Sequence, residues 1–194
     1  MKIWQLGRMA VGVLSVMLLS GCAGLLIGGT AVGVSVVHDR RTTGTLVDDQ
    51  TIELKVYGAL NGELPPGNRI NATSYNGVVL LTGEVISEEA RQKAEVATRN
   101  IIPPVREVFN ELVVGPPDSL STRSNDAFLT TKVKTALFQI KIADFDPTRV
   151  KVVTERSVVY LMGLVRPNEA DASANVASQV SGVRQVVTLF EFIN

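Results

Sequence analysis

NGVVLLTGEV, residues 76 to 85, returns eighty positions later as RSVVYLMGLV, residues 156 to 165. Each stretch begins with two residues that suit a tight turn and continues as an apolar run, which is typical of the second strand of a β-hairpin. The Asn-Gly pair that opens the first copy is the stronger of the two turn signals. Because side chains alternate between the faces of a strand, we predict that four of them enter a core. They are Val79, Leu81, Val159 and Leu161.

The rest of the chain repeats in the same order, which indicates two homologous units. The matching segments are KVYGAL (55–60) with KVKTAL (132–137), EEARQKAEVA (88–97) with NEADASANVA (168–177), and VREVFNEL (105–112) with VRQVVTLF (183–190). We therefore predict one domain at residues 46–114 and a second at residues 125–194. Residues 115–124 are rich in Pro, Ser and Thr, and they are predicted to link the two domains.

Both units are predicted to have an α+β fold with the order helix, strand, strand, helix, strand. Asp48 or Asp49 is the predicted N-cap of the first helix, and Asn125 or Asp126 is its counterpart in the second unit. The second copy of that helix carries an apolar stripe at helical spacing. Its members are Leu129, Val133, Ala136, Leu137 and Ile140. Two helices packed on one face of a three-stranded sheet would bury such stripes, so we expect a two-layer domain in each copy.

This order of elements and a set of marked residues resemble the BON domain. The marks are the hairpin-strand glycines Gly83 and Gly163, the alanine-rich helix after each, and the Val-x-x-Val strands at Val105 and Val108 and at Val183 and Val186. One departure is that Pro103-Pro104 stands in the first unit where the second has Gly182, so the turn there must differ. The resemblance covers residues 46–194 and implies two BON domains in tandem.

The only cysteine of the chain, Cys22, lies at the end of a predicted export signal, residues 1–21. Lys2 and Arg8 form a short basic region, and an uncharged apolar run follows it. The sequence LSGC at 19–22 resembles the bacterial lipobox, which implies that Cys22 becomes the first residue of the mature protein and carries three acyl chains, including palmitate. An ordinary signal peptide with an accidental cysteine is the alternative.

Residues 22–45 are predicted to be a lipidated N-terminus and a tether. The uncharged part, 23–37, is too short to span a bilayer, and it suits either a flexible tether or a helix that self-associates through its small residues. By resemblance, Ala23 after the cysteine implies the outer membrane. The whole chain thus resembles the dual BON-domain lipoproteins of Gram-negative bacteria, anchored in the outer membrane with their domains in the periplasm.

Composition and motifs argue against several classes of function. Loss of Lys2 and Arg8 with the signal would leave 17 basic and 19 acidic residues, which is not the balance of a nucleic-acid-binding protein. The sequence offers no set of nucleophile and base, no phosphate-binding loop and no metal-ligand motif, so we expect no enzyme, no cofactor and no metal. Asp144 and Asp146 could together contact calcium, but a polar loop is the better interpretation because further ligands are missing.

The first helix of the second domain suggests a membrane-contact site. On a helical wheel, Phe128 and Phe138 lie well away from the apolar stripe, with Lys134 beside them and Lys132 on the flank. Outward aromatic rings next to lysines are typical of helices that lie in the lipid headgroup region. We therefore predict that these four residues bind phospholipid. The alternative is that both rings fold over the edge of the core or contact the first domain.

The net charge of each domain and the resemblance to the BON family both favour the second domain as the one that contacts the membrane. Residues 45–114 carry ten acidic and six basic residues, whereas residues 118–194 carry eight and nine, so only the second domain approaches an anionic membrane without repulsion. BON domains are regarded as phospholipid-binding modules. The expected protein is a lipoprotein that binds anionic phospholipid and helps to maintain envelope integrity. The alternative is an adaptor that holds an envelope or outer-membrane assembly protein at the membrane.

Replacing Cys22 with serine should abolish lipidation and retention in the membrane fraction, since no other side chain in the chain offers a thiol. Mass spectrometry of the N-terminal peptide of the wild-type protein checks this. An unmodified Cys22, or cleavage at another position, would contradict the lipoprotein interpretation.

Overall fold

The computed structural model describes residues 39–194, and these residues form one compact unit. Within them, no helix is both long enough and apolar enough to cross a membrane. The predicted signal peptide, Cys22 and the apolar segment 23–37 lie outside the described residues. The described part therefore contains both repeated domains and the short segment that enters them.

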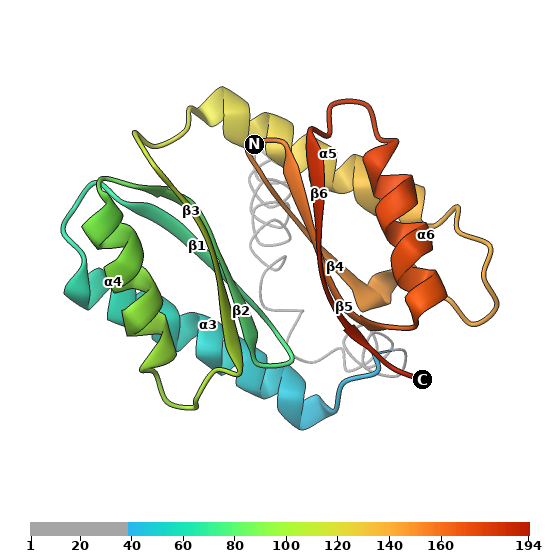
Figure 1. Ribbon diagram of the computed structural model, residues 1–194, viewed down its shortest axis with the longest axis horizontal. Helices are drawn as coiled ribbons and strands as arrows, with labels where there is room; N and C mark the ends of the chain where they lie inside the picture. Colours follow the sequence, from blue (N-terminus) through green and yellow to red (C-terminus); the bar gives the residue numbers. More distant parts are fainter. Residues whose placement is uncertain (1–38) are drawn as a thin grey trace, which may run out of the picture. The chain divides into compact units, whose positions relative to one another are not determined.

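Each domain shows the predicted order of helix, strand, strand, helix, strand (Figure 1). The elements of domain 1 are α3 (Thr43–Glu63), β1 (Arg69–Tyr75), β2 (Val78–Val85), α4 (Glu88–Arg99) and β3 (Glu107–Val114). The elements of domain 2 are α5 (Leu120–Leu137), the 3-10 helix η2 (Pro147–Arg149), β4 (Val150–Glu155), β5 (Val158–Val165), α6 (Pro167–Ser178) and β6 (Gln185–Phe192). The predicted α+β fold class is confirmed.

The second strand of each domain is the middle strand of a three-stranded sheet. It pairs antiparallel with the first strand and parallel with the third, and the pattern is the same in both sheets. Gly83 lies opposite Ile70, and Gly163 lies opposite Val150, so the two glycines occupy equivalent positions as predicted. A Cβ atom on Gly83 would lie 2.1 Å from the carbonyl oxygen of Arg69, so this position accepts only glycine.

A separate apolar core lies between the helices and the sheet of each domain. Figure 1 shows α3 and α4 beside the sheet of β1, β2 and β3, and α5 and α6 beside the other sheet. The four predicted strand residues Val79, Leu81, Val159 and Leu161 are fully buried in these cores. On α5, the predicted stripe supplies the buried Leu129. Helix and sheet thus bury complementary apolar faces, as the sequence pattern predicts.

One buried aspartate in each domain fastens the hairpin turn to the first helix. Asp49 of α3 accepts hydrogen bonds from the backbone N–H groups of Asn76 and Gly77, at 2.7 and 2.8 Å. Asp126 of α5 accepts the two N–H groups of turn 156–157, at 2.8 and 2.9 Å. Both turns have positive φ at two successive residues, as in type I′ hairpins. The charge-assisted hydrogen bonds offset the strain of the second turn, which contains no glycine.

The first helix of each domain begins earlier than predicted. Thr42 is the N-cap of α3 and Ser119 is the N-cap of α5, and each hydroxyl accepts a hydrogen bond from a backbone N–H in the first turn. The predicted N-caps are Asp48 or Asp49 and Asn125 or Asp126. That prediction is wrong, because these positions lie inside the helices. Helix α5 therefore begins within segment 115–124, which the sequence predicts to be a linker.

The other face of each sheet is also buried, because the two sheets pack against each other. Six buried side chains form this third core: Tyr75, Val78, Leu80, Val158, Tyr160 and Met162. All eight residues of β2 are buried as a result. A strand that is covered on both faces has a continuous apolar sequence instead of an alternating one, and VVLLTGEV fits that description. The two-layer prediction holds within each domain but misses this contact between domains.

Replacing Gly83 with alanine should lower the free energy of unfolding by more than about 2 kcal/mol, because φ there is +117° and a methyl group would meet backbone. Gly58 on α3 is the matched control. A Cβ atom there meets nothing within 4 Å, so alanine should stabilise the helix by about 0.5–1 kcal/mol. Urea unfolding of residues 39–194 measures both changes. Equal effects of the two substitutions would contradict the register of β1 and β2.

Candidate membrane-contact site

The outward face of α5 carries exposed apolar side chains. Phe128 is 61% exposed and Phe138, the C-cap residue, is 70% exposed. The earlier start of the helix adds Leu120, which is 74% exposed and lies five turns before Phe138 on the same side. Both rings are too exposed to be folded over the edge of the core, which was one of the two alternatives; the other, contact with the first domain, stays open. The face offers apolar groups that lie outside all three cores.

Phe128 and Lys132 form one pair on this face. The ammonium nitrogen of Lys132 lies 5.5 Å from the centroid of the Phe128 ring, within cation–π range. The same nitrogen donates a hydrogen bond to the carbonyl oxygen of Ser181 at 2.6 Å. Lys132 is therefore held in place, with its ammonium group beside the ring.

Lys134 and Phe138 line a cavity of about 390 Å³ at the end of α5. The other lining residues are Arg41, Tyr75, Pro147, Thr148, Val150 and Lys151. Among the residues of the described part that line the cavity, three side chains are cationic and none is a carboxylate. Domain 1 and the segment before it supply part of the wall, so the cavity belongs to both domains.

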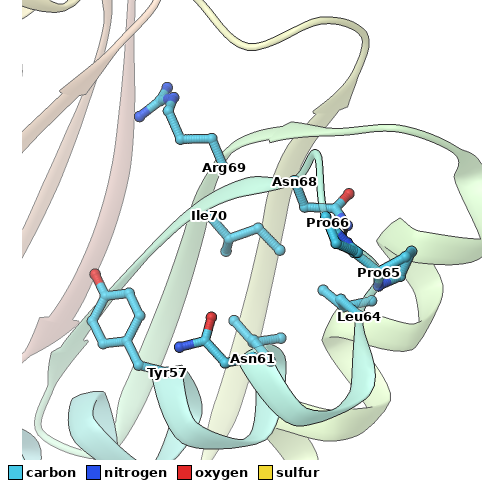
Figure 2. Close-up of a pocket in the computed structure, with 9 residues that line it drawn as sticks. Tyr57, Asn61, Leu64, Pro65, Pro66, Asn68, Arg69 and Ile70 are labelled. Carbon is cyan, nitrogen blue, oxygen red and sulfur yellow. Dashed lines mark hydrogen bonds between the residues drawn. The ribbon is translucent and has the colours of Figure 1, made fainter.

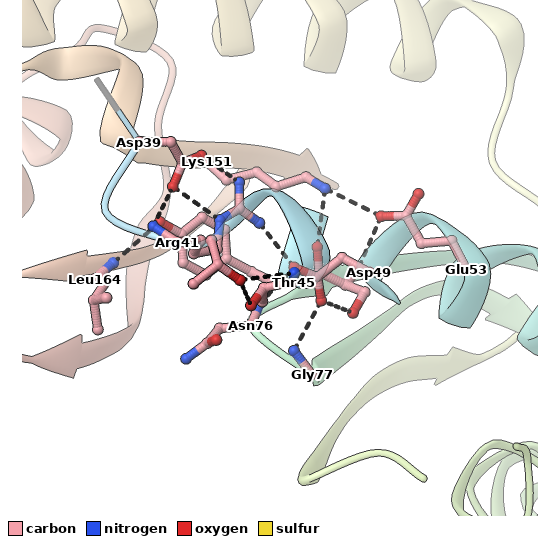
Figure 3. A network of polar contacts seen from close by, with 12 residues as sticks. Asp39, Arg41, Thr45, Asp49, Glu53, Asn76, Gly77, Lys151 and Leu164 are labelled. Atoms are coloured by element: carbon pink, nitrogen blue, oxygen red, sulfur yellow. Dashed lines mark hydrogen bonds and ion pairs between the residues drawn. The ribbon is translucent and has the colours of Figure 1, made fainter. Parts of the chain in front are cut away.

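Arg41 lies in a dense polar network where the chain enters domain 1 (Figure 3). Its guanidinium group stacks on the ring of Tyr75, 3.8 Å from the ring centroid. It also donates to both carboxylate oxygens of Asp39 and to Oδ2 of Asp49, the latter at 2.9 Å. The hydrogen bonds from Arg41 lower the pKa of Asp39 in spite of its burial. This network holds Arg41 against the wall of the cavity.

The two lysines of the cavity differ in their surroundings. Lys151, on β4, donates hydrogen bonds to Oε1 of Glu53 and to the carbonyl oxygen of Ser74, both at 3.1 Å and both in domain 1. Lys134 makes no hydrogen bond or ion pair with any described residue, and its side chain is exposed. The charge of Lys134 is therefore available to a ligand.

The preceding residue, Arg40, binds domain 2. Its guanidinium nitrogens donate to both carboxylate oxygens of Glu169, at 2.6 and 2.8 Å, and to the carbonyl oxygen of Leu164 at 2.9 Å. Glu169 is completely buried, and the hydrogen bond from Arg40 is the main reason that its pKa is lowered. Arg40 and Arg41 thus attach the entering segment to both domains.

Domain 1 has a cavity at the corresponding place, between the end of its first helix and the start of its first strand (Figure 2). Its volume is about 590 Å³. Tyr57 and Asn61 occupy the positions that correspond to Lys134 and Phe138 in the repeat. Arg69, the one cation among the described residues of this lining, is bound to carboxylates. The repeat therefore provides two cavities, and the cationic lining belongs to the one at α5.

Three carboxylates from Glu84, Asp118 and Glu155 converge within 4.8 Å at a second contact between the domains. Arg69 donates to Glu84 at 2.8 Å and also to Glu155. Arg156 binds Asp118 at 3.1 Å. Burial raises the pKa of Glu155, although Arg69 opposes this effect. Because two guanidinium groups already lie among the acids, we interpret the cluster as an ion network between domains and assign no metal to it.

The structure brings the four predicted patch residues together as two pairs, one along α5 and one at its end. Cys22, the predicted lipid attachment site, lies outside the described residues. The sequence analysis missed Arg41 and Lys151, because they come from segments that are distant from α5 in the chain and carry no motif. The position of these two residues follows only from the packing of the two domains.

Comparison with known proteins identifies the family to which this chain belongs. The model of the BON domain matches residues 48–116 and 125–194, so the chain belongs to the BON-domain family and contains two such domains. Over their full lengths the chain is 38% identical to outer membrane lipoprotein DolP of Haemophilus influenzae. It is 34% identical to the 21 kDa hemolysin of Actinobacillus pleuropneumoniae, over 80% of this chain and 79% of that protein.

Among solved structures, similarity is low. The C-terminal domain of CdsD, a structural protein of the type III secretion system of Chlamydia trachomatis, aligns with 73% of this chain and 96% of its own. The identity is 12% and the TM-score is 0.30, a level from which we infer neither fold nor function.

Replacing Glu169 with glutamine should lower the free energy of unfolding by about 3 kcal/mol at pH 7, because Arg40 loses its buried partner while the helix cap keeps an oxygen acceptor. The folded-state pKa of Glu169 is below the unfolded value of about 4.3, so this stabilisation is complete above that pH and disappears as pH falls through the folded-state pKa. The difference between the variant and the wild type should therefore be constant above about pH 4.3 and shrink as pH falls below that value.

Urea unfolding at several pH values checks the effect of Glu169. Glu63→Gln, at the exposed end of α3, is the control and should change stability by less than about 0.5 kcal/mol. A difference between Glu169→Gln and wild type that does not depend on pH would rule out the Arg40 pair as its source.

Proposed function

We propose that this protein is a non-enzymatic outer-membrane lipoprotein whose second BON domain binds anionic phospholipid and so supports the integrity of the envelope. In this proposal Cys22 carries the acyl anchor and the domains lie in the periplasm. The observation that carries the proposal is the outward face of α5, where Phe128 and Phe138 are exposed beside Lys132 and Lys134. The full-length similarity to an outer membrane lipoprotein supports the location.

The chemistry of this face suits a bilayer surface. Burial of a phenylalanine side chain in the acyl boundary contributes roughly 1.5–3 kcal/mol, and this contribution depends little on salt. A lysine near an anionic bilayer contributes about 1 kcal/mol, and that contribution weakens as salt rises. The contributions of two rings and two lysines together are enough for reversible binding to an anionic bilayer.

The proposed acyl anchor on Cys22 and the proposed lipid-binding face of α5 are connected to neighbouring points of the described unit. Arg41 lines the cavity beside Phe138, and Cys22 precedes Asp39 by 17 residues. An acyl group on Cys22 would therefore be joined covalently to a point next to α5. Such a tether raises the effective concentration of the patch at the bilayer, so that the patch itself need not bind strongly.

An adaptor that holds an envelope assembly protein at the membrane is the other candidate function. Exposed aromatic rings suit a protein partner as well as a lipid. The lysines beside the rings favour lipid, because an anionic headgroup uses the rings and the charges at the same time. The following experiment separates the two functions.

Phe128→Glu should reduce co-sedimentation of residues 39–194 with anionic vesicles by at least tenfold, since it removes one buried ring and adds a like charge. Both domains are included because domain 2 alone would expose the sheet face that contains Tyr160 and Met162. The matched control is Leu54→Glu on α3 of domain 1, where an exposed apolar residue receives the same substitution. Circular dichroism confirms that each variant is folded.

Two results would contradict lipid binding by this face. One is a folded Phe128→Glu variant that binds vesicles as well as the wild type. The other is an unmodified protein that does not bind anionic vesicles at low salt, in which case the adaptor function becomes the better candidate.

A further inference from the structure

We propose that the cavity at the end of α5 holds the phosphate of an anionic phospholipid headgroup, and that domain 1 completes this site. The inference rests on the proposed function and extends it. It assigns the phosphate to Lys134, Lys151 and Arg41, of which only Lys134 lies on α5. Lipid recognition then belongs to the junction of the two domains instead of to one helix.

The lining of the cavity is the first argument. Its volume of about 390 Å³ lies in the range of small-ligand sites. Arg41, Lys134 and Lys151 contribute three positive charges, and no carboxylate from residues 39–194 lines the wall. A cavity with this lining favours an anion over a neutral or cationic ligand.

The acids near these cations are already occupied. Both carboxylate oxygens of Asp49 accept backbone N–H groups of the hairpin turn. Oε1 of Glu53 accepts from Lys151 and also from the backbone N–H of Ser74, at 2.8 Å. Asp39 binds Arg41. These carboxylates balance part of the positive charge, and none of the three lines the cavity.

Donors remain free for a phosphate. Lys134 has no partner among the described residues, so its three N–H groups can all reach an anion. Arg41 uses three of its five N–H groups on Asp39 and Asp49, which leaves two. Lys151 is 39% exposed and has one N–H beyond its two bonds to domain 1. Phosphate oxygens accept several such hydrogen bonds at once.

The surroundings of the cavity fit a lipid. Phe138 lines the same cavity and is 70% exposed, so its ring can enter the acyl boundary while a phosphate lies beside Lys134. The corresponding cavity of domain 1 has Tyr57 and Asn61 at these two positions, so neither the lysine nor the phenylalanine is repeated there, and the cation that lines it, Arg69, is bound to carboxylates. The cationic lining is therefore particular to the α5 cavity and is not a general property of the fold.

The first test uses phosphatidylcholine vesicles with and without phosphatidylglycerol. Lys134→Met and Lys151→Met in residues 39–194 should each weaken binding to the anionic vesicles by about fivefold or more, and the two together by more than either. Lys93→Met, an exposed lysine on α4 of domain 1, is the control for loss of one charge and should change binding less than twofold. Lys134 makes no hydrogen bond or ion pair within residues 39–194, so its substitution should leave the fold of this part intact.

The second test removes the bilayer, so that attraction to a charged surface plays no part. Titration of the 15N-labelled protein with sn-glycerol 3-phosphate should shift the backbone amide signals of Thr148, Val150 and Lys151 in NMR spectra. At equal concentrations of the ester the shifts should be strongly reduced in Lys134→Met and in Lys151→Met, and retained in Phe128→Glu. Inorganic phosphate, titrated in parallel, tests whether the glycerol ester is needed.

The outcomes separate this inference from the proposed function. Vesicle binding that depends on Phe128 but not on Lys151, together with no shifts around the cavity, would overturn the phosphate site and leave the lipid-binding face in place. Shifts from inorganic phosphate without any effect of Lys151→Met on vesicles would overturn the lipid assignment in favour of free phosphate. Loss of vesicle binding in Lys151→Met, with shifts from the glycerol ester, supports the site as proposed.

Discussion

The face-to-face packing of the two sheets is the contact on which the rest of the structure depends. It covers β2 and β5 on both sides, with Leu80 and Met162 completely buried between the sheets. Burial of a large apolar side chain contributes roughly 1.5–3 kcal/mol, so six such residues make a strong contact between two small domains. The pair of domains therefore behaves as one compact unit, and its surface includes sites that neither domain has alone.

Ion pairs at the border of this core give the contact its register. Lys151 of domain 2 reaches Glu53 of domain 1, and Arg69 of domain 1 reaches Glu155 of domain 2. The Arg69 pair is specific, because the carboxylate of Glu155 is buried and would cost several kcal/mol without its cation. The cavity at the end of α5 is a product of this register, since its cations come from three segments that are distant in the chain.

The two copies of the repeat share their internal contacts but differ at the surface. Both keep a buried aspartate that holds the hairpin turn, and both keep a cavity between the first helix and the first strand. The exposed rings and the cationic lining occur at the α5 copy. We interpret domain 1 as the part that supports the entering segment and completes the wall, and domain 2 as the part that meets the membrane.

The sequence predicts the elements well because their signals are local. The repeat, the order of elements, the equivalent glycines and the outward direction of Phe128 and Phe138 all follow from spacing along one segment. The helix starts were wrong because Asp49 and Asp126, good N-cap residues by type, bind turns about thirty residues away. The contact between the sheets is signalled in the sequence only by the continuous apolar run of β2. No sequence signal marks the position of Arg41 at the cavity, because that position depends on the packing of two domains.

The most direct test of this account measures which surface meets the bilayer. Anionic bicelles with a nitroxide-labelled phospholipid would be added to 15N-labelled residues 39–194, and the paramagnetic broadening of each amide signal would be recorded by NMR. The account predicts the strongest broadening on α5 around Phe128 and Phe138 and at the cavity wall near Lys151 and Arg41. Broadening that centres instead on the outward face of α4 would contradict it.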